Sequence, residues 1–155
     1  MHTHHYYMKQ AYIQALKALK QDEVPVGAII VKDDKIIARA YNKKEKLKIP
    51  YAHAEIIAIK KACNKLKTWH LDGCTMYVTL EPCAMCAGAL IHARIQQVIY
   101  GAKSYQDGAI ESKLHLYEIE GFNHYPIAIL YNSFPQCSKI ISNYFKCKRE
   151  KTKNI

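Results

Sequence analysis

Three side chains in two short motifs have the types and the spacing of a metal site. Ala52-His53-Ala54-Glu55 contributes a histidine, and Pro82-Cys83-Ala84-Met85-Cys86 contributes two cysteines three positions apart. Thiolates and imidazoles are ligands that zinc prefers, and three protein ligands leave its fourth tetrahedral position open to water. Zinc lowers the pKa of such a water to about 7, which makes hydroxide available at neutral pH. We therefore predict a catalytic zinc site formed by His53, Cys83 and Cys86.

Glu55 follows this histidine by two residues and is the candidate general acid and base. A water that attacks carbon needs a nearby group that takes up and releases its protons, and a carboxylate serves that purpose. A glutamate in the first turn of a helix is more often a solvated residue favoured by the helix dipole. The coupling of Glu55 to both halves of the metal motif favours the catalytic interpretation.

The alternative interpretation of Cys83 and Cys86 is a structural zinc knuckle, or a pair of buried thiols. Structural zinc sites normally have four protein ligands. No fourth cysteine or histidine stands at motif spacing nearby, which favours the catalytic site.

The cysteine pair is expected at the start of a helix. A strand-like run, Thr75–Leu80, stops before Pro82, and proline suits the first position of a helix. Residues three apart share a helix face, so both sulfurs can reach one metal ion. The positive end of the helix dipole also favours thiolate over thiol. Glu81, just before the proline, is interpreted as a capping or turn residue.

The histidine motif is expected in the opening turn of another helix. Residues two apart do not share a helix face, so His53 and Glu55 can serve one site only where a helix begins. Pro50 disfavours helix just upstream, and an apolar pattern of helical spacing begins at Ile56 and runs to about Leu66. Two helix N-termini should therefore converge on the metal.

The remaining chain alternates strands and helices. We expect a first helix ending near Gln21, a hairpin of strands 26–31 and 36–41, a loop 42–51, a helix from Cys83 to about Ala93, a strand 97–102, a long loop with a short helix over 103–124, a strand 126–131 and a final helix 138–149. This alternation predicts an α/β domain with helices on both faces of one sheet, and the hairpin makes that sheet mixed.

Length and composition suit one domain spanning residues 1–155, with a basic C-terminal helix and tail from about residue 138. The chain lacks a long apolar run and a signal-peptide pattern, so we expect a cytoplasmic protein. Six cysteines in such a chain indicate reduced thiols plus a metal, and a disulfide framework is disfavoured. The cysteines outside the motif, interpreted as packing or partly exposed thiols, are Cys63, Cys74, Cys137 and Cys147. A second cluster consists of His2, His4 and His5. Incidental metal binding is one interpretation of these histidines, and a mobile N-terminus is the favoured one.

The formal net charge of +10 favours an acidic polymer as partner. One lysine cluster precedes the histidine motif and consists of Lys43, Lys44, Lys46 and Lys48. The C-terminal segment interleaves aromatic and basic residues, which suits unstacked RNA bases and their phosphates; it comprises Tyr144, Phe145, Lys146, Lys148, Arg149, Lys151 and Lys153. The alternative is a solvated helix face. Because this segment is far in sequence from the metal motifs, we expect it to affect RNA binding more than chemistry.

The motifs resemble those of bacterial tRNA-specific adenosine deaminases. His-x-Glu with Pro-Cys-x-x-Cys is typical of zinc-dependent nucleobase deaminases, and the similarity extends from Tyr6 to about Arg149. The segments that carry it are Glu23–Ala28, Ala52–Ile56, Tyr77–Cys86, Ala87–His92, Tyr100–Lys103 and Asn123-His124.

The resemblance implies a three-layer α/β/α cytidine deaminase-like fold with a central mixed five-stranded sheet, and one zinc ion per chain. It implies that zinc-bound hydroxide attacks C6 of adenosine at the wobble (first anticodon) position of tRNA, with Glu55 as proton shuttle. Asn42 and the Ala54 backbone N–H would hold the flipped base. Without the resemblance, Asn42 would be an ordinary turn residue. The family also implies a homodimer, for which the small residues Ala84, Ala87, Gly88 and Ala89 offer a helix surface.

Two departures from the family concern recognition of the anticodon loop. Ile49-Pro50-Tyr51 stands where the family usually has Asp-Pro-Thr. Ser104 stands where an aspartate commonly handles the substrate sugar, so it is the candidate contact there. Two other functions stay open: deamination of a free base such as guanine or cytosine, and non-catalytic RNA binding stabilised by zinc.

Overall fold

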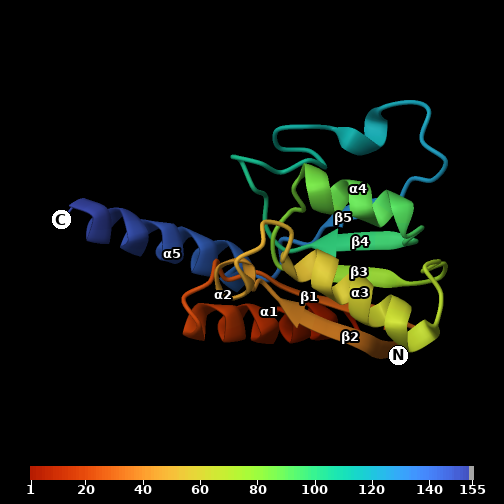
Figure 1. Ribbon diagram of the computed structural model, residues 1–155, viewed down its shortest axis with the longest axis horizontal. Helices are drawn as coiled ribbons and strands as arrows, with labels where there is room; N and C mark the ends of the chain where they lie inside the picture. Colours follow the sequence, from red (N-terminus) through yellow and green to blue (C-terminus); the bar gives the residue numbers. More distant parts are fainter. Residues whose placement is uncertain (154–155) are drawn as a thin grey trace.

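A computed structural model of the chain describes residues 1–153. Its centre is a five-stranded mixed sheet with the strand order β2-β1-β3-β4-β5 (Figure 1). β1 is antiparallel to both β2 and β3, whereas β4 and β5 run parallel to β3. The strands are β1 (Gly27–Lys32), β2 (Lys35–Tyr41), β3 (Thr75–Val78), β4 (Gln97–Tyr100) and β5 (Ile127–Leu130). The predicted mixed α/β sheet is confirmed.

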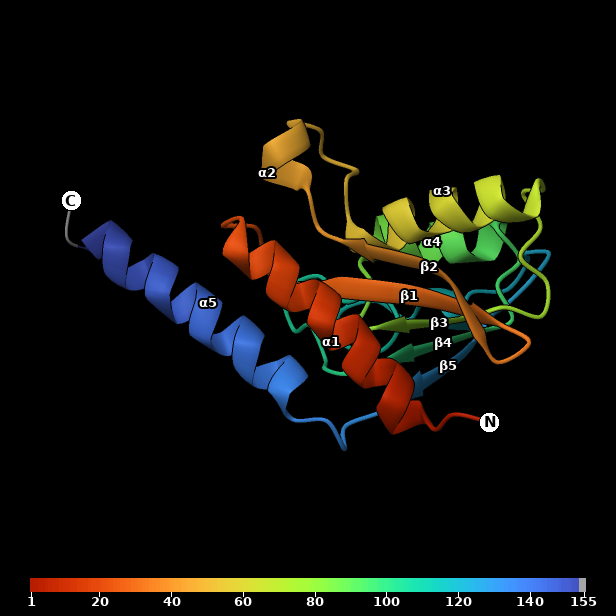
Figure 2. The same cartoon turned by 90° about the horizontal axis from the view of Figure 1, so that it is seen from below.

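Helices cover both faces of this sheet. α1 and α5 lie on one face, and α3 and α4 lie on the other (Figure 2). The helices are α1 (His4–Lys20), α2 (Lys44–Leu47), α3 (Ala54–Leu66), α4 (Ala84–His92), the single turn η1 (Leu116–Glu118) and α5 (Gln136–Lys153). The predicted three-layer α/β/α architecture is therefore confirmed.

Each face of the sheet has its own apolar core. Ile30 of β1 packs with residues of α3 and α4, whereas its neighbour Ile29 packs with residues of α1 and α5. Because both faces are buried, the central strands β1, β3 and β4 are apolar along most of their length, whereas the edge strand β2 also carries Lys35 and Arg39. α1 also approaches β1 closely: a Cβ on Gly27 would lie 2.1 Å from the Ala11 carbonyl oxygen, so this position requires glycine.

Several element boundaries differ from the prediction. α4 begins at Ala84 with Cys83 as its N-cap, so Pro82 lies before the cap and not at the first helical position. β3 ends at Val78 and β4 at Tyr100, each two residues earlier than expected. α5 is longer than expected at both ends, and α2 interrupts the loop expected over 42–51.

The prediction that the N-terminal histidines lie on a mobile segment is wrong from His4 onward. His4 and His5 belong to α1, whose N-cap Thr3 accepts a hydrogen bond from the Tyr6 N–H. The His4 ring nitrogen Nδ1 lies 2.7 Å from the Tyr77 hydroxyl, which ties the helix to the sheet.

The four cysteines outside the metal motif are free thiols, as predicted. Cys74 and Cys137 are buried, and Cys147 is exposed. Within residues 1–153, no helix is both long enough and apolar enough to cross a bilayer.

Candidate active site

The two metal motifs come together where α3 and α4 begin. His53 is the N-cap of α3 and Cys83 is the N-cap of α4, and Cys86 lies one turn further along α4. Ligand atoms of these three residues all lie within 4.8 Å of one another, and the described part of the chain contains no other such group. The first three histidines of the sequence form no second cluster there.

The spacing of the ligand atoms fits zinc. The His53 Nδ1 atom lies 3.6 Å from the Cys83 sulfur and 3.5 Å from the Cys86 sulfur. A nitrogen about 2.1 Å and a sulfur about 2.3 Å from one tetrahedral ion would be roughly 3.6 Å apart. Both the donor set and its separations therefore fit a zinc ion held by three protein ligands.

The surroundings of Cys83 stabilise its sulfur as a thiolate. Hydrogen bonds from the Cys86 thiol and from His53 lower the pKa of Cys83 to about 4, although burial opposes the change. The same shared hydrogen bond, together with burial, raises the pKa of Cys86 far above its ordinary value. Zinc binding would therefore release a proton from Cys86, because only the thiolate is a ligand.

Glu55 lies in the first turn of α3 and is 4% exposed. Burial raises the pKa of its carboxyl group to about 7, and the group is hydrogen-bonded to Cys86. The alternative interpretation of Glu55 as a solvated first-turn acid is wrong. The carboxyl group borders both the cysteine pair and the cleft described next.

A cleft of about 640 Å³ opens onto the metal site. Its walls come from six parts of the chain: the segment before β1, the loop after β2, the start of α3, the loop after β3, the loop after β4, and α5. Besides His53, Glu55 and Cys83, the lining residues are Val24, Val26, Asn42, Lys44, Ala54, Leu80, Glu81, Lys103, Ser104, Tyr105, Gln106, Asp107, Ser138, Ile141, Ser142, Phe145 and Arg149. The cleft lies beyond the carboxyl ends of β3 and β4, where ligands of α/β sheets commonly bind.

The predicted base contacts lie in this cleft. The side chain of Asn42 is 6% exposed; its Nδ2 donates to the Val24 carbonyl oxygen and its Oδ1 accepts from the Lys44 N–H. Ala54 is the first residue of α3, where backbone N–H groups have no partner within the helix. Ser104 also lines the cleft, and its hydroxyl donates to Asp107 at 2.8 Å.

The predicted RNA contacts of α5 divide between two faces. Phe145 and Arg149 line the cleft, although they are far in sequence from the metal motifs. The C-terminal segment is therefore far from the metal motifs in sequence, but part of it lies in the same cleft as the metal ligands.

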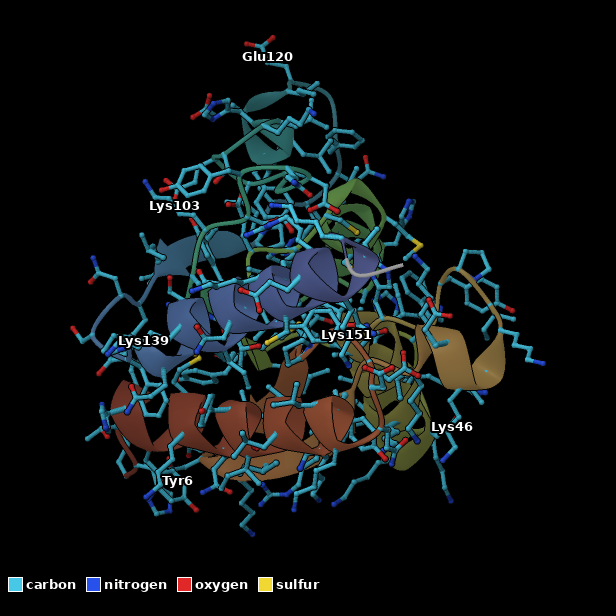
Figure 3. All side chains as sticks on the ribbon, turned by 90° about the vertical axis from the view of Figure 1, so that its left-hand side faces the viewer. Tyr6, Lys46, Lys103, Glu120, Lys139 and Lys151 are labelled. Carbon is cyan, nitrogen blue, oxygen red and sulfur yellow. The ribbon has the colours of Figure 1, made fainter. Side chains whose placement is uncertain are left out.

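Tyr144 and Lys148 face a second groove, which lies between α1 and α5. The Lys148 ammonium is 3.0 Å from the Asp22 carboxylate and lies over the Tyr144 ring. Lys146 is exposed and lines neither space. In Figure 3, which looks along the molecule from the free end of α5, the helix lies between α1 and the upper loops.

The prediction missed the part of the cleft that follows β4, namely Lys103, Tyr105, Gln106 and Asp107, and also the two valines before β1. The parallel arrangement of β3 and β4 is the signal that could have found the loop, because the carboxyl ends of parallel strands meet at one edge.

Known deaminases resemble this chain in sequence. The family model described as MafB19-like deaminase matches residues 2–149. A tRNA-specific adenosine deaminase of Aquifex aeolicus is 44% identical over 91% of this chain and 93% of that protein. The chain belongs to the tRNA-specific adenosine deaminase family.

Solved structures agree with membership of the tRNA-specific adenosine deaminase family. A structure from studies of A-to-I editing by tRNA:A34 deaminases at the wobble position of transfer RNA has a TM-score of 0.85. It is 38% identical, and the match covers 88% of this chain and 99% of that one. Guanine deaminase from Bacillus subtilis is less similar, with a TM-score of 0.64 and 30% identity over 96% of this chain and 95% of that one.

Proposed function

We propose that this protein deaminates adenosine hydrolytically to inosine at the wobble position of tRNA. The observation that carries the proposal is the convergence of His53, Cys83, Cys86 and buried Glu55 at one cleft with a basic helix in its wall. Relatives at 38–44% identity that are named tRNA-specific adenosine deaminases support the substrate.

The metal ligands in this proposal are His53, Cys83 and Cys86, which would hold one zinc ion per chain. Zinc bound there supplies a Lewis acid that brings the pKa of a coordinated water toward neutrality. The two helix N-termini that meet at the site add positive potential, which stabilises negative charge there.

Glu55 moves the protons of the reaction. Its carboxylate accepts a proton from the attacking water and delivers one to the amino nitrogen on C6, which leaves as ammonia. One water is consumed and the amino group is replaced by oxygen, so adenosine becomes inosine. The buried position of Glu55 beside the cleft limits its contact with bulk water.

Asn42 and Ala54 orient the adenine base. The Ala54 N–H, free at the start of α3, can donate to a base nitrogen. The bonds of Asn42 to Val24 and Lys44 fix its amide, so that its second Nδ2 hydrogen points at a defined place. A single-stranded anticodon loop presents such a base at an unstacking cost of a few kcal/mol or less.

Incubation of the purified protein with an anticodon stem–loop that carries A34, followed by inosine mapping, tests the proposal. The expected result is inosine at the first anticodon position only. Turnover of free guanine or cytosine without any inosine in the stem–loop would instead support the free-base alternative, which the similarity to guanine deaminase suggests. Bound zinc with no turnover of either substrate would support non-catalytic RNA binding.

Arg149 and Lys148 make a matched pair for testing the RNA contacts of α5. Arg149→Ala should weaken stem–loop binding and reduce the salt slope by up to about 0.7 to 0.9, the value for one lost phosphate contact. Lys148→Ala should change both less, because Lys148 already pairs with Asp22. Filter binding at several salt concentrations measures both quantities.

Phe145→Ala should weaken binding without changing the salt slope, because stacking on a base releases no counterion. Equal binding by all three variants and the parent protein would instead place the RNA footprint at the lysine cluster from Lys43 to Lys48. Lys146, exposed beside these residues, remains a proposed phosphate contact.

We also propose a homodimer formed through α4. Ala84 is exposed and Gly88 and Ala89 are half-buried, whereas Ala87 is buried inside the protomer and does not contribute to the surface. The exposed side of α4 therefore keeps small residues that permit close packing of a second copy.

Gly88→Arg should convert a dimer into a monomer. A Cβ on Gly88 meets no atom within 4 Å, so the protomer accommodates the side chain while a partner helix does not. Light scattering at micromolar concentration measures the mass, and Glu120→Arg on an exposed loop is the control. A monomeric mass for the parent protein would refute the proposed dimer.

We propose that residues 1–155 form a single catalytic domain that acts in the cytoplasm. The last two residues of that range lie outside the described residues. α5 belongs to this domain because it supplies one wall of the cleft.

A further inference from the structure

Two buried carboxylates take no part in the proposed chemistry. Glu23 is 0% exposed and Glu81 is 3% exposed. Neither forms an ion pair with a lysine or an arginine in residues 1–153. An unpaired buried carboxylate is costly unless hydrogen bonds satisfy it. Both groups instead accept hydrogen bonds from backbone N–H groups of loops that border the cleft.

Glu81 holds the loop that follows β4. Its Oε1 accepts from the Ser104 N–H at 3.1 Å and from the Ser112 hydroxyl. Its Oε2 accepts from the N–H groups of Ile110, Glu111 and Ser112 at 2.9–3.1 Å. One carboxylate thus satisfies four backbone donors over residues 104–112. Glu81 was predicted to be a structural residue of a cap or turn. It is structural, but it accepts hydrogen bonds from a distant loop and not from its own turn.

Gly108 is fitted to this arrangement. A Cβ there would lie 2.4 Å from the carboxyl carbon of Glu81, so only glycine allows the loop to sit on the carboxylate. Gly108 also pairs with Cys83, and the Ala109 N–H donates to the Pro82 carbonyl oxygen at 2.9 Å. The loop is therefore fixed directly against Cys83, the metal ligand at the N-cap of α4, and its residues Lys103 to Asp107 form one wall of the cleft.

Glu23 holds the opposite wall in the same way. Its Oε1 accepts from the Glu45 N–H at 2.9 Å and its Oε2 from the Lys46 N–H at 2.8 Å. These donors belong to the first turn of α2, whose own N-cap makes no side-chain hydrogen bond. Lys44 of this turn lines the cleft. In the view of Figure 3, Lys46 on α2 and Lys103 lie on opposite sides of α5.

We propose that Glu23 and Glu81 are positioning residues, which fix the two loops that grip the RNA on either side of the reacting base. The inference rests on the proposed function, because it assumes that these loops contact the anticodon. Without these carboxylates, the backbone N–H groups of each loop would lose their hydrogen-bond partners. A loop that is already held rigid loses less conformational entropy when it binds RNA.

Glu81→Gln tests the first loop. The amide oxygen can keep the three donors at Oε2, but the amide nitrogen then faces the Ser104 N–H and cannot accept from it. We expect KM for the stem–loop to rise about three- to tenfold, with kcat per bound zinc changed by less than about twofold. Glu120→Gln is the matched control, because Glu120 is exposed on the loop at the top of Figure 3. This variant should leave KM and kcat unchanged.

Glu23→Gln tests the second loop, because one of its two N–H partners must be lost. The same KM change is expected. A purely structural role would instead lower the melting temperature and the fraction of active protein while leaving KM unchanged. Values of KM within about twofold of the parent for both variants would overturn the proposal.

Amide hydrogen exchange separates this inference from the proposed function, since it needs no turnover. Glu81→Gln should speed exchange over 104–112 and leave 45–46 protected, whereas Glu23→Gln should do the reverse. Unchanged exchange in both variants would refute the positioning role. If the parent protein does not deaminate the stem–loop, the proposed function fails and the exchange pattern still decides whether the carboxylates hold the loops.

Discussion

Replacing Glu55 with alanine is expected to lower kcat for deamination by about 10² to 10⁴-fold while the protein keeps its fold and its zinc. Glu55 is not among the three clustered ligands, so its removal leaves the metal donors in place. It is the buried carboxyl group in the cleft wall beside them, and the reaction needs one group to take a proton from water and give one to the leaving amine. Single-turnover rates on the stem–loop measure the loss.

Glu118→Ala is the matched control for this experiment. Glu118 also lies in a helical turn, η1, but its side chain is exposed and does not line the cleft. It should retain full activity. A decrease of less than about tenfold for Glu55→Ala would refute the assigned proton transfer. Loss of zinc from this variant would mean that the carboxylate is a ligand.

Removing one thiolate is expected to abolish both metal binding and turnover. Cys86 is fully buried and contributes one of the three ligand atoms, so Cys86→Ala leaves only two protein donors. Without the metal, the several kcal/mol of Lewis-acid stabilisation are lost, which corresponds to a fall in kcat of about a thousandfold or more. Metal analysis of the parent protein should give one zinc per chain, and chelation followed by added zinc should remove and restore activity.

Cys74→Ala is the matched control, because Cys74 is also fully buried but lies in the core away from the cluster. This variant should be less stable than the parent yet keep its zinc. Less than half occupancy in parent protein never exposed to a chelator would contradict the predicted site. So would full zinc content in Cys86→Ala.

The amino-acid sequence by itself determined the chemistry of the site. Two ligands three residues apart at a helix start, and a histidine followed by Glu55, are local patterns whose geometry depends on one helical turn each. α3 and α4 were therefore predicted to within a few residues. The mixed sheet followed in the same way, because continuous apolar strands alternating with amphipathic helices have few other arrangements.

Only the tertiary structure decided which residues surround that chemistry. Tyr144 and Lys148 share one face of α5, and Phe145 and Arg149 share the next. Each pair consists of one aromatic and one basic residue, so the sequence alone does not distinguish the pair that faces the cleft. Packing of α5 beside α1 turns the first pair toward Asp22 and the second toward the cleft.

The roles of Glu23 and Glu81 depended on tertiary structure for a related reason. Each accepts hydrogen bonds from backbone groups more than twenty residues away in the chain. Such bonds carry no sequence pattern, because any residue type supplies a backbone N–H. A local motif can specify which atoms react, whereas the folded chain alone specifies which loops are held against them.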